Sequence, residues 1–177
     1  IEELRCVDPK TLYYAWFEAC KENKLSMLYT MPVKDGKIIT KNTFNMSTIP
    51  SDVSYMLGVT QTDMVPIVLE GVTKKFAKAI IKKGAPCYNF NRDLPGDNSG
   101  AWHSSDLLYA FGTLGNNWRP FEDVDYTISH QMLSAITAFA KTGNPNCAEI
   151  PDWQSGYAEP MRFCENTRCE KWDTKKL

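Results

Sequence analysis

Several features are scarce or missing in this chain, and each absence narrows what the protein can do. Only two histidines, His103 and His130, occur in 177 residues. The six cysteines form no Cys-x-x-Cys pair and have no histidine at metal-ligand spacing, so the sequence predicts no metal site. The apolar runs, such as those at 67–69 and 79–81, are far too short to span a bilayer.

The chain also has no excess of charge of either sign. Its 20 Lys and Arg residues are balanced by 21 Asp and Glu residues, which gives a formal net charge of −1. This balance offers no electrostatic reason to expect nucleic acid or a membrane as a partner. Hydrophobic residues make up 43% of the chain, enough to build the core of one ordinary domain.

Helical periodicity is present at both ends of the chain. Residues 1–23 predict a helix, with one apolar face made of Leu4, Leu12, Ala15, Trp16 and Ala19. The clearest helix is predicted over 123–146, with either Asp123 or Asp125 capping its start and Gly143 ending it. Its apolar stripe consists of Ile128, Met132, Ile136, Phe139 and Ala140. His130 lies off this stripe, which predicts an exposed side chain.

Strand signals alternate with the helical ones. Residues 49–65 contain a short apolar run at 54–59 that predicts a buried strand, and 87–93 predict a second strand. Between them, 70–84 predict an amphipathic helix that ends at Gly84. An Asp-Gly turn within 31–39 predicts a hairpin or strand corner. This alternation predicts an α/β fold, in which ligands bind beyond the carboxyl ends of the strands.

The tail of the chain, residues 153–172, predicts a terminal hairpin. Cys164 and Cys169 flank its turn. A disulfide between them and two free thiols both remain open, and free thiols are favoured.

His103 lies in the segment GAWHSSDLLYAFG, at 100–112. This segment resembles the histidine loop of type-B carboxylesterases, the α/β-hydrolase family that includes cholinesterases and bacterial para-nitrobenzyl esterases. Three further segments resemble this family in the same order along the chain: MPVKDGKII, IPSDVSYMLGVTQTDM, and SHQMLSAITAFAKTGNPN followed by PDW. The resemblance implies the C-terminal portion of an α/β-hydrolase fold, with a mostly parallel sheet, flanking helices and the terminal hairpin.

The resemblance also implies the chemistry. His103 would be the catalytic base, and Asp63, where most family members have Glu, would be the acid that orients it. Trp102 and Met64 would contact a small-molecule ester substrate, and no cofactor is expected. Asp106 is the nearest rival acid, but its position after two serines favours the first turn of a helix over 107–111.

One element of the family's catalytic machinery is missing. None of the ten serines lies in a Gly-x-Ser-x-Gly motif, which presents the nucleophile in this family. We therefore expect residues 1–177 to be the C-terminal half of a single catalytic domain, with the nucleophilic serine on an upstream N-terminal half that acts as its partner. The chain alone should be inactive. The alternative is a non-catalytic, cholinesterase-like module that binds another protein.

Overall fold

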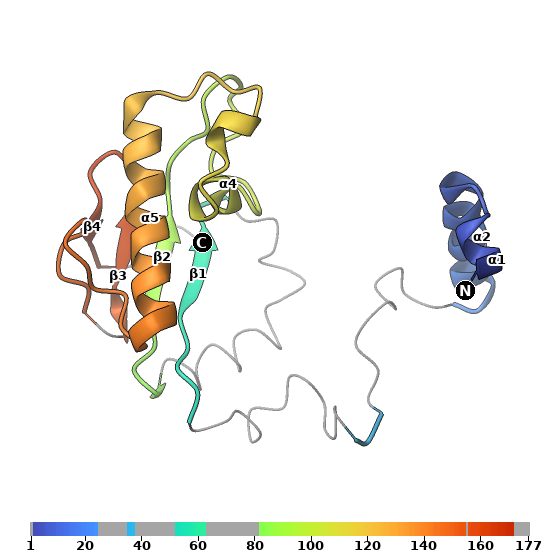
Figure 1. Cartoon of the computed structure of the whole chain (residues 1–177), viewed down its shortest axis with the longest axis horizontal. Helices are drawn as coiled ribbons and strands as arrows, with labels where there is room; N and C mark the ends of the chain where they lie inside the picture. The colour runs from blue at the N-terminus through green and yellow to red at the C-terminus, as the bar shows by residue number, and fades with distance from the viewer. Residues whose placement is uncertain (1, 25–34, 38–51, 63–81, 155, 172–177) are drawn as a thin grey trace. The chain divides into compact units, whose positions relative to one another are not determined.

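The computed structural model of the chain describes residues 2–24, 35–37, 52–62, 82–154 and 156–171 (Figure 1). The chain divides into two compact units, Ile1–Thr43 and Phe44–Leu177. Each unit is considered by itself below.

The N-terminal unit contains two helices, α1 (Glu2–Arg5) and α2 (Pro9–Glu22), where the sequence predicts one. The helix breaks because Pro9 has no N–H to donate and disfavours helical geometry in the residue before it. Asp8 instead caps α2, since its carboxylate accepts a hydrogen bond of 2.9 Å from the backbone N–H of Thr11. The prediction of a continuous helix over 1–23 is therefore wrong.

The apolar face predicted for this segment is not buried either. Cys20 is the buried residue of α2, whereas Leu4, Leu12 and Trp16 are exposed. An amphipathic pattern buries a face only where another element packs on it, and α1 is the other helix in the described part of this unit. The Asp-Gly turn is confirmed: the backbone N–H of Lys37 donates to Asp35 Oδ1 at 2.9 Å. The rest of 31–39 lies outside the described residues.

The C-terminal unit is built on a four-stranded sheet in the order β1-β2-β3-β4. Its strands are β1 (Leu57–Thr60), β2 (Pro86–Phe90), β3 (Gly156–Phe163) and β4 (Arg168–Cys169). The first three strands run parallel, and β4 is antiparallel to β3. This arrangement confirms the predicted mainly parallel sheet with its terminal hairpin. Because parallel strands end at the same edge, the chain leaves β1 and β2 side by side (Figure 1).

Two strand predictions need correction. The strand predicted at 54–59 begins only at Leu57, and it is not fully buried, because Gly58 and Val59 are exposed. The exposure follows from its position, since β1 is the outermost strand of the described sheet. The second strand ends at Phe90 rather than at residue 93, because its neighbour β3 ends at Phe163, which is paired with Phe90.

Helix α5 (Asp123–Thr142) is the longest helix among the described residues. It ends, as predicted, at Gly143, which has the left-handed φ of 77° that closes a helix. Its N-cap, however, is Glu122 rather than Asp123 or Asp125. Asp125, in the first turn of the helix, contributes to the cap, because its carboxylate accepts a hydrogen bond of 2.9 Å from the backbone N–H of Glu122.

The helices pack on the sheet through one hydrophobic core. Helix α4 (Asp106–Ala110) begins one residue earlier than predicted. The 3-10 turn η2 (Leu114–Asn116) lies between α4 and α5 in the chain. Of the predicted stripe of α5, Ile128 and Met132 are buried, but Ala140 is exposed because it lies one turn beyond the core. The fully buried members of the core include Phe90, Leu94, Tyr109, Leu114, Ile128, Met132, Met161 and Phe163.

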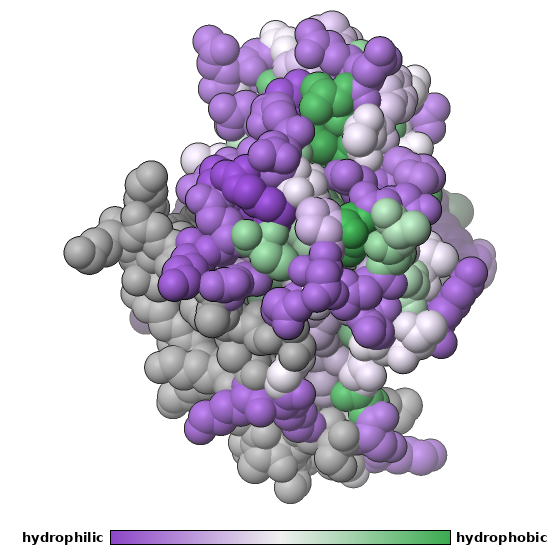
Figure 2. All heavy atoms as spheres, turned by 90° about the vertical axis from the view of Figure 1, so that its left-hand side faces the viewer, coloured by the Kyte–Doolittle hydropathy of each residue, from purple (hydrophilic) through white to green (hydrophobic). Residues whose placement is uncertain are grey.

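The outer surface near β4 and α5 is mostly hydrophilic, with hydrophobic residues in small separate patches (Figure 2). Within the described ranges, no helix has the length and apolar character needed to cross a bilayer. Cys164 and Cys169 are free thiols, so the hairpin is not bridged. For the helix predicted at 70–84, residues 70–81 lie outside the described part of the chain. Gly84 has the left-handed φ of 77° expected where a helix ends.

Candidate active site

His103 lies in a short turn between β2 and α4. Two backbone hydrogen bonds close the turn. The N–H of Ser105 donates to the carbonyl of Trp102 at 3.0 Å, and the N–H of Leu107 donates to the carbonyl of Ser104 at 3.2 Å. Ser104 has a φ of 70°, a left-handed conformation that few residues other than glycine adopt. The side chain of His103 is exposed. A backbone with fixed geometry therefore presents an accessible imidazole.

The end of β1 is joined to this turn. Thr62, two residues beyond β1, forms a parallel bridge with Trp102, and its backbone N–H donates to the carbonyl of Ala101 at 3.0 Å. The next residue after Thr62 is Asp63, and the next after Trp102 is His103. Asp63 and Met64 themselves lie outside the described residues. The structure thus brings together the two segments that lead into the predicted acid and base.

Gly100 is required where these two segments meet. Its φ is +70°, and a Cβ at this position would lie 3.1 Å from Thr62 Oγ1. Such a contact is tighter than ordinary van der Waals packing, and an L side chain is strained at this φ. Glycine therefore permits the close approach of the end of β1 to the segment before His103.

The loop leading to His103 is anchored from a distant segment. Arg119 donates two parallel hydrogen bonds of 2.8 Å to the carboxylate of Asp97 and a third, also of 2.8 Å, to the carbonyl of Pro95. The hydrogen bonds from Arg119, together with those from Ser99, hold the pKa of Asp97 well below its usual range. Bidentate pairs of this kind fix orientation as well as distance, so the tip of the loop has a defined geometry.

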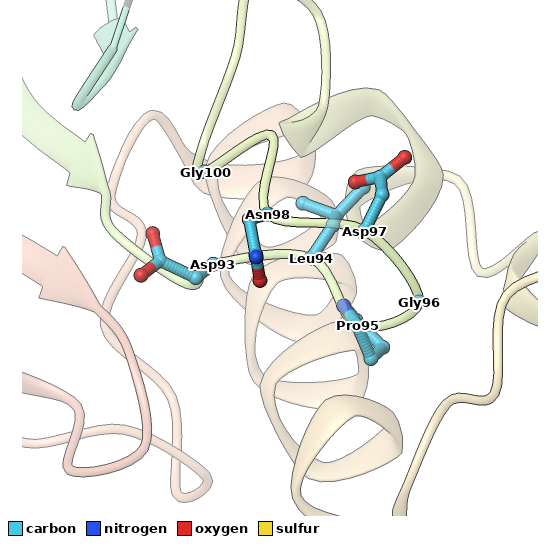
Figure 3. Close-up of a pocket in the computed structure, with 7 residues that line it drawn as sticks. All are labelled: Asp93, Leu94, Pro95, Gly96, Asp97, Asn98 and Gly100. Carbon is cyan, nitrogen blue, oxygen red and sulfur yellow. The ribbon is translucent and has the colours of Figure 1, made fainter.

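The same loop forms an open hollow, lined by Asp93, Leu94, Pro95, Gly96, Asp97, Asn98 and Gly100 (Figure 3). The carboxylates of Asp93 and Asp97 point away from each other, so they do not form a paired acid site (Figure 3). Neither Trp102 nor His103 lines the hollow. It reflects the shape of the loop and is separate from the histidine turn.

Asp106, the rival acid, is engaged by a tyrosine from the sheet. The hydroxyl of Tyr88 in β2 donates to Asp106 Oδ2 at 2.9 Å. Burial, reinforced by the neighbouring carboxylate of Asp106, raises the pKa of Tyr88 far above its usual range, so the phenol stays protonated and able to donate. Asp106 lies in the first turn of α4, as the sequence predicts.

A buried ion pair fastens the end of β2 to the helices. Arg92 Nε donates to Asp125 Oδ1 at 2.7 Å, and its Nη1 reaches Glu165 Oε1 at 2.5 Å. The hydroxyl of Tyr109 also donates to Asp125 Oδ1 at 2.7 Å. Burial alone would raise the pKa of the fully buried Asp125, but hydrogen bonds from Arg92, the backbone of Glu122 and Tyr109 outweigh it and hold the pKa below its usual value.

Sequence reasoning missed these supporting residues. A partial signal exists for Tyr88, because alternation along β2 places it on the same face of the sheet as Phe90, toward the core. No local pattern links Tyr88 to Asp106 or Arg92 to Asp125, since these contacts join separate elements of the chain. His130 is exposed on α5, as predicted, whereas Trp102 is half-buried against the core.

Within the described ranges, no three His, Cys, Asp or Glu side chains gather in a way that could hold a metal ion.

The carboxylesterase family model matches residues 66–176 of the chain. The chain belongs to the carboxylesterase family. The matched range contains the histidine turn, β2, α4, α5 and the terminal hairpin, but not β1 or Thr62. Family membership thus applies to the part of the chain in which His103 lies.

Carboxylesterases are also found among the similar solved structures. A PNB esterase is 26% identical with a TM-score of 0.51, and the match covers 59% of this chain and 24% of that one. A thermophilic PNB esterase is 25% identical with a TM-score of 0.51, and the match covers 59% of this chain and 23% of that one. An esterase from Clostridium hathewayi, described as able to hydrolyse aliphatic aromatic polyesters, is 24% identical with a TM-score of 0.51. This match covers 60% of this chain and 23% of the esterase. The match therefore spans about a quarter of the length of each, and the fold is that of a portion of an α/β-hydrolase.

Proposed function

We propose that this chain is the C-terminal part of a carboxylesterase catalytic domain and supplies the histidine and the acid of a catalytic triad. The nucleophilic serine would belong to a preceding part of the same protein. His103 is the base, Asp63 is the acid, and the substrate is a small carboxylic ester. Trp102 and Met64, each adjacent to one of these residues in the sequence, would contact the substrate.

The proposed reaction needs one proton carrier. His103 takes the proton from the serine hydroxyl as the serine oxygen attacks the ester carbonyl. It then returns this proton to the alcohol oxygen as the carbon–oxygen bond of the ester breaks and the acyl-enzyme forms. In the second half, His103 takes a proton from water, which attacks the acyl group, and returns it to the serine. Asp63 holds the imidazole in the tautomer that has its free nitrogen toward the serine and stabilises the imidazolium.

The bridge between Thr62 and Trp102 is the observation that carries this proposal. It holds the segment before Asp63 against the segment before His103, at the carboxyl edge of a parallel sheet where α/β enzymes bind their ligands. The carboxylesterase family model, whose match to residues 66–176 includes His103, supports the role of that histidine. The hydrogen bond from Tyr88 already engages Asp106, which supports Asp63 rather than Asp106 as the acid.

The 177-residue chain alone should not hydrolyse p-nitrophenyl acetate above the rate of free imidazole. The reason is that it contains no Gly-x-Ser-x-Gly motif, and the oxyanion donors and the nucleophile supply most of the acceleration in such enzymes. The measurement is hydrolysis by the chain and by the complete protein, with stoichiometric labelling by a fluorophosphonate in parallel. Labelling of the chain itself would contradict the proposal, and an unlabelled, inactive complete protein would favour the non-catalytic binding module.

Asp63→Asn should leave the complete protein folded but lower kcat/KM by as much as about 10⁴-fold, because an amide can donate to the ring and hold the wrong tautomer. Asp63→Glu should cost no more than about tenfold, or 1.4 kcal/mol, because it retains the carboxylate. Steady-state kinetics of these two variants are compared with those of Asp106→Asn. Full activity in Asp63→Asn together with loss of turnover in Asp106→Asn would assign the acid to Asp106 instead.

A further inference from the structure

We propose that Ser104 is a positioning residue for His103. Its backbone adopts a left-handed conformation at a cost in stability, and this conformation fixes the turn that presents the exposed imidazole. The inference rests on the proposed function only in taking His103 as the catalytic base. It does not depend on which carboxylate orients that base, and Ser104 is not required to touch the substrate.

The backbone from Trp102 to Ser105 forms a four-residue turn with an unusual third residue. The N–H of Ser105 donates to the carbonyl of Trp102 at 3.0 Å, so His103 and Ser104 are the two central residues of the turn. Ser104 has a φ of 70°. A positive φ at this position is typical of a type II turn, where glycine is favoured because it has no Cβ. A serine here therefore adopts a conformation that is unfavourable for it.

The position of Ser104 distinguishes it from the other residue with such a backbone. Among the described residues other than glycine, only Lys24 also has a positive φ, of 52°. Lys24 follows the C-cap of α2, a place where a left-handed residue commonly ends a helix. Ser104 ends no helix, since α4 begins two residues after it. Strain at such a place persists only where the surrounding structure imposes it, and it is a recurring feature of functional sites.

The next residue, Ser105, carries a second cost. Its side chain is fully buried, and its Oγ is one of three buried side-chain atoms in the described part of the chain that have no hydrogen-bond partner. A hydroxyl buried in this way destabilises the fold. The two residues that follow His103 are thus both held against their local preferences. Such conflicts between local and overall structure are expected at functional sites.

The turn is imposed by contacts on both of its sides. Before it, Ala101 is fully buried, and its carbonyl accepts the backbone N–H of Thr62 at 3.0 Å. After it, the buried Ser105 leads directly into α4. Because both ends are fixed, the φ of Ser104 determines the path of the chain between them. It therefore also determines the direction in which the side chain of His103 leaves the backbone.

The test uses substitutions of Ser104 in the complete protein. Ser104→Pro fixes φ near about −65° and so forbids the observed turn, although it still allows the extended conformation that a type II turn needs at His103. It should lower kcat by about 10²-fold with little change in KM, because a misplaced base fails in the reaction rather than in substrate binding. Ser104→Gly permits the same φ at lower cost, so it should retain most of kcat and raise Tm by about 1–2 °C.

A milder variant and a matched control accompany these two. Ser104→Thr keeps the hydroxyl but is branched at Cβ, which disfavours a positive φ, so its kcat should lie between those of the proline and glycine variants. It carries the comparison with Ser104→Gly if Ser104→Pro does not fold. Lys24→Pro and Lys24→Gly change the other left-handed residue and should alter kcat by less than about twofold. Equal losses of kcat from proline at the two positions, or a lower Tm in Ser104→Gly, would overturn the proposal.

A measurement on the turn itself separates this proposal from the proposed function. Hydrogen exchange of the Ser105 amide, resolved to single residues by mass spectrometry, reports the hydrogen bond to Trp102. Ser104→Pro should speed this exchange by about tenfold or more, and Ser104→Gly should leave it close to that of the wild type, even if the protein has no esterase activity. Unchanged exchange in Ser104→Pro would refute the role of Ser104 regardless of activity. Faster exchange with a wild-type kcat would refute it as well, since His103 would then not depend on the turn.

Discussion

Under the proposed function, His103→Ala is expected to lower kcat of the complete protein by about 10³-fold or more, because the serine would lose the group proposed to remove its proton. His130→Ala should change kcat by less than about twofold, since His130 is an exposed residue of α5. The measurement is the hydrolysis of p-nitrophenyl acetate at saturating substrate.

His130→Ala is the matched control for His103→Ala, because both variants remove an imidazole from the same chain. The fold should be retained in both, as both imidazoles lie on the surface. Comparable losses from the two substitutions would show that the active-site histidine has been assigned wrongly.

Asp125→Ala should have the largest effect on stability, with a loss of about 3–5 kcal/mol in the free energy of unfolding. The carboxylate is fully buried and receives hydrogen bonds from Arg92, Tyr109 and the backbone of Glu122. Its removal leaves the guanidinium of Arg92, itself largely buried, without its main partner. Urea unfolding of the complete protein, followed by tryptophan fluorescence, measures the loss.

The same carboxylate predicts a dependence on pH. Its pKa in the folded chain lies below the unfolded value of about 3.9, so the folded state binds the proton less readily. The stabilisation is therefore complete above this unfolded value and disappears as the pH falls through the lower, folded one. Asp125→Asn should lose this part of the acid sensitivity. Asp123→Asn, an exposed acid in the same turn, should change the stability by less than about 1 kcal/mol, and equal losses from the two would contradict the role of the buried pair.

The parts of the fold that could be predicted are those set by local patterns. The long helix α5 follows from its periodicity and from Gly143, and the terminal hairpin follows from its two strands and the turn between them. The break at Pro9 has a local cause as well, the Asp-Pro pair, which outweighs the periodicity of residues 1–23. The turn signal is therefore present in the sequence itself, in the Asp8-Pro9 pair.

The supporting contacts of the site could not be predicted in this way. His103 and its turn carry a recognisable sequence, but Tyr88 reaches Asp106 only because the β1 residue beside its ring is Gly58. Arg92 and Arg119 likewise find their carboxylates in other elements of the chain. Such pairs depend on how strands and helices pack, and a single sequence does not specify that packing.

The pairing of the strands has a consequence for how the protein folds. Leu57 pairs with Cys87 and Phe90 with Phe163, so the sheet joins residues that are far apart in the chain, whereas the backbone hydrogen bonds within α4 and α5 join residues close in sequence. Closing such long loops is entropically costly, and topologies rich in distant contacts fold slowly. The bridge between Thr62 and Trp102 lies beyond the end of the β1–β2 pairing, so we expect it to form after that pairing. We therefore expect the segments that lead into the proposed acid and base to meet late in folding.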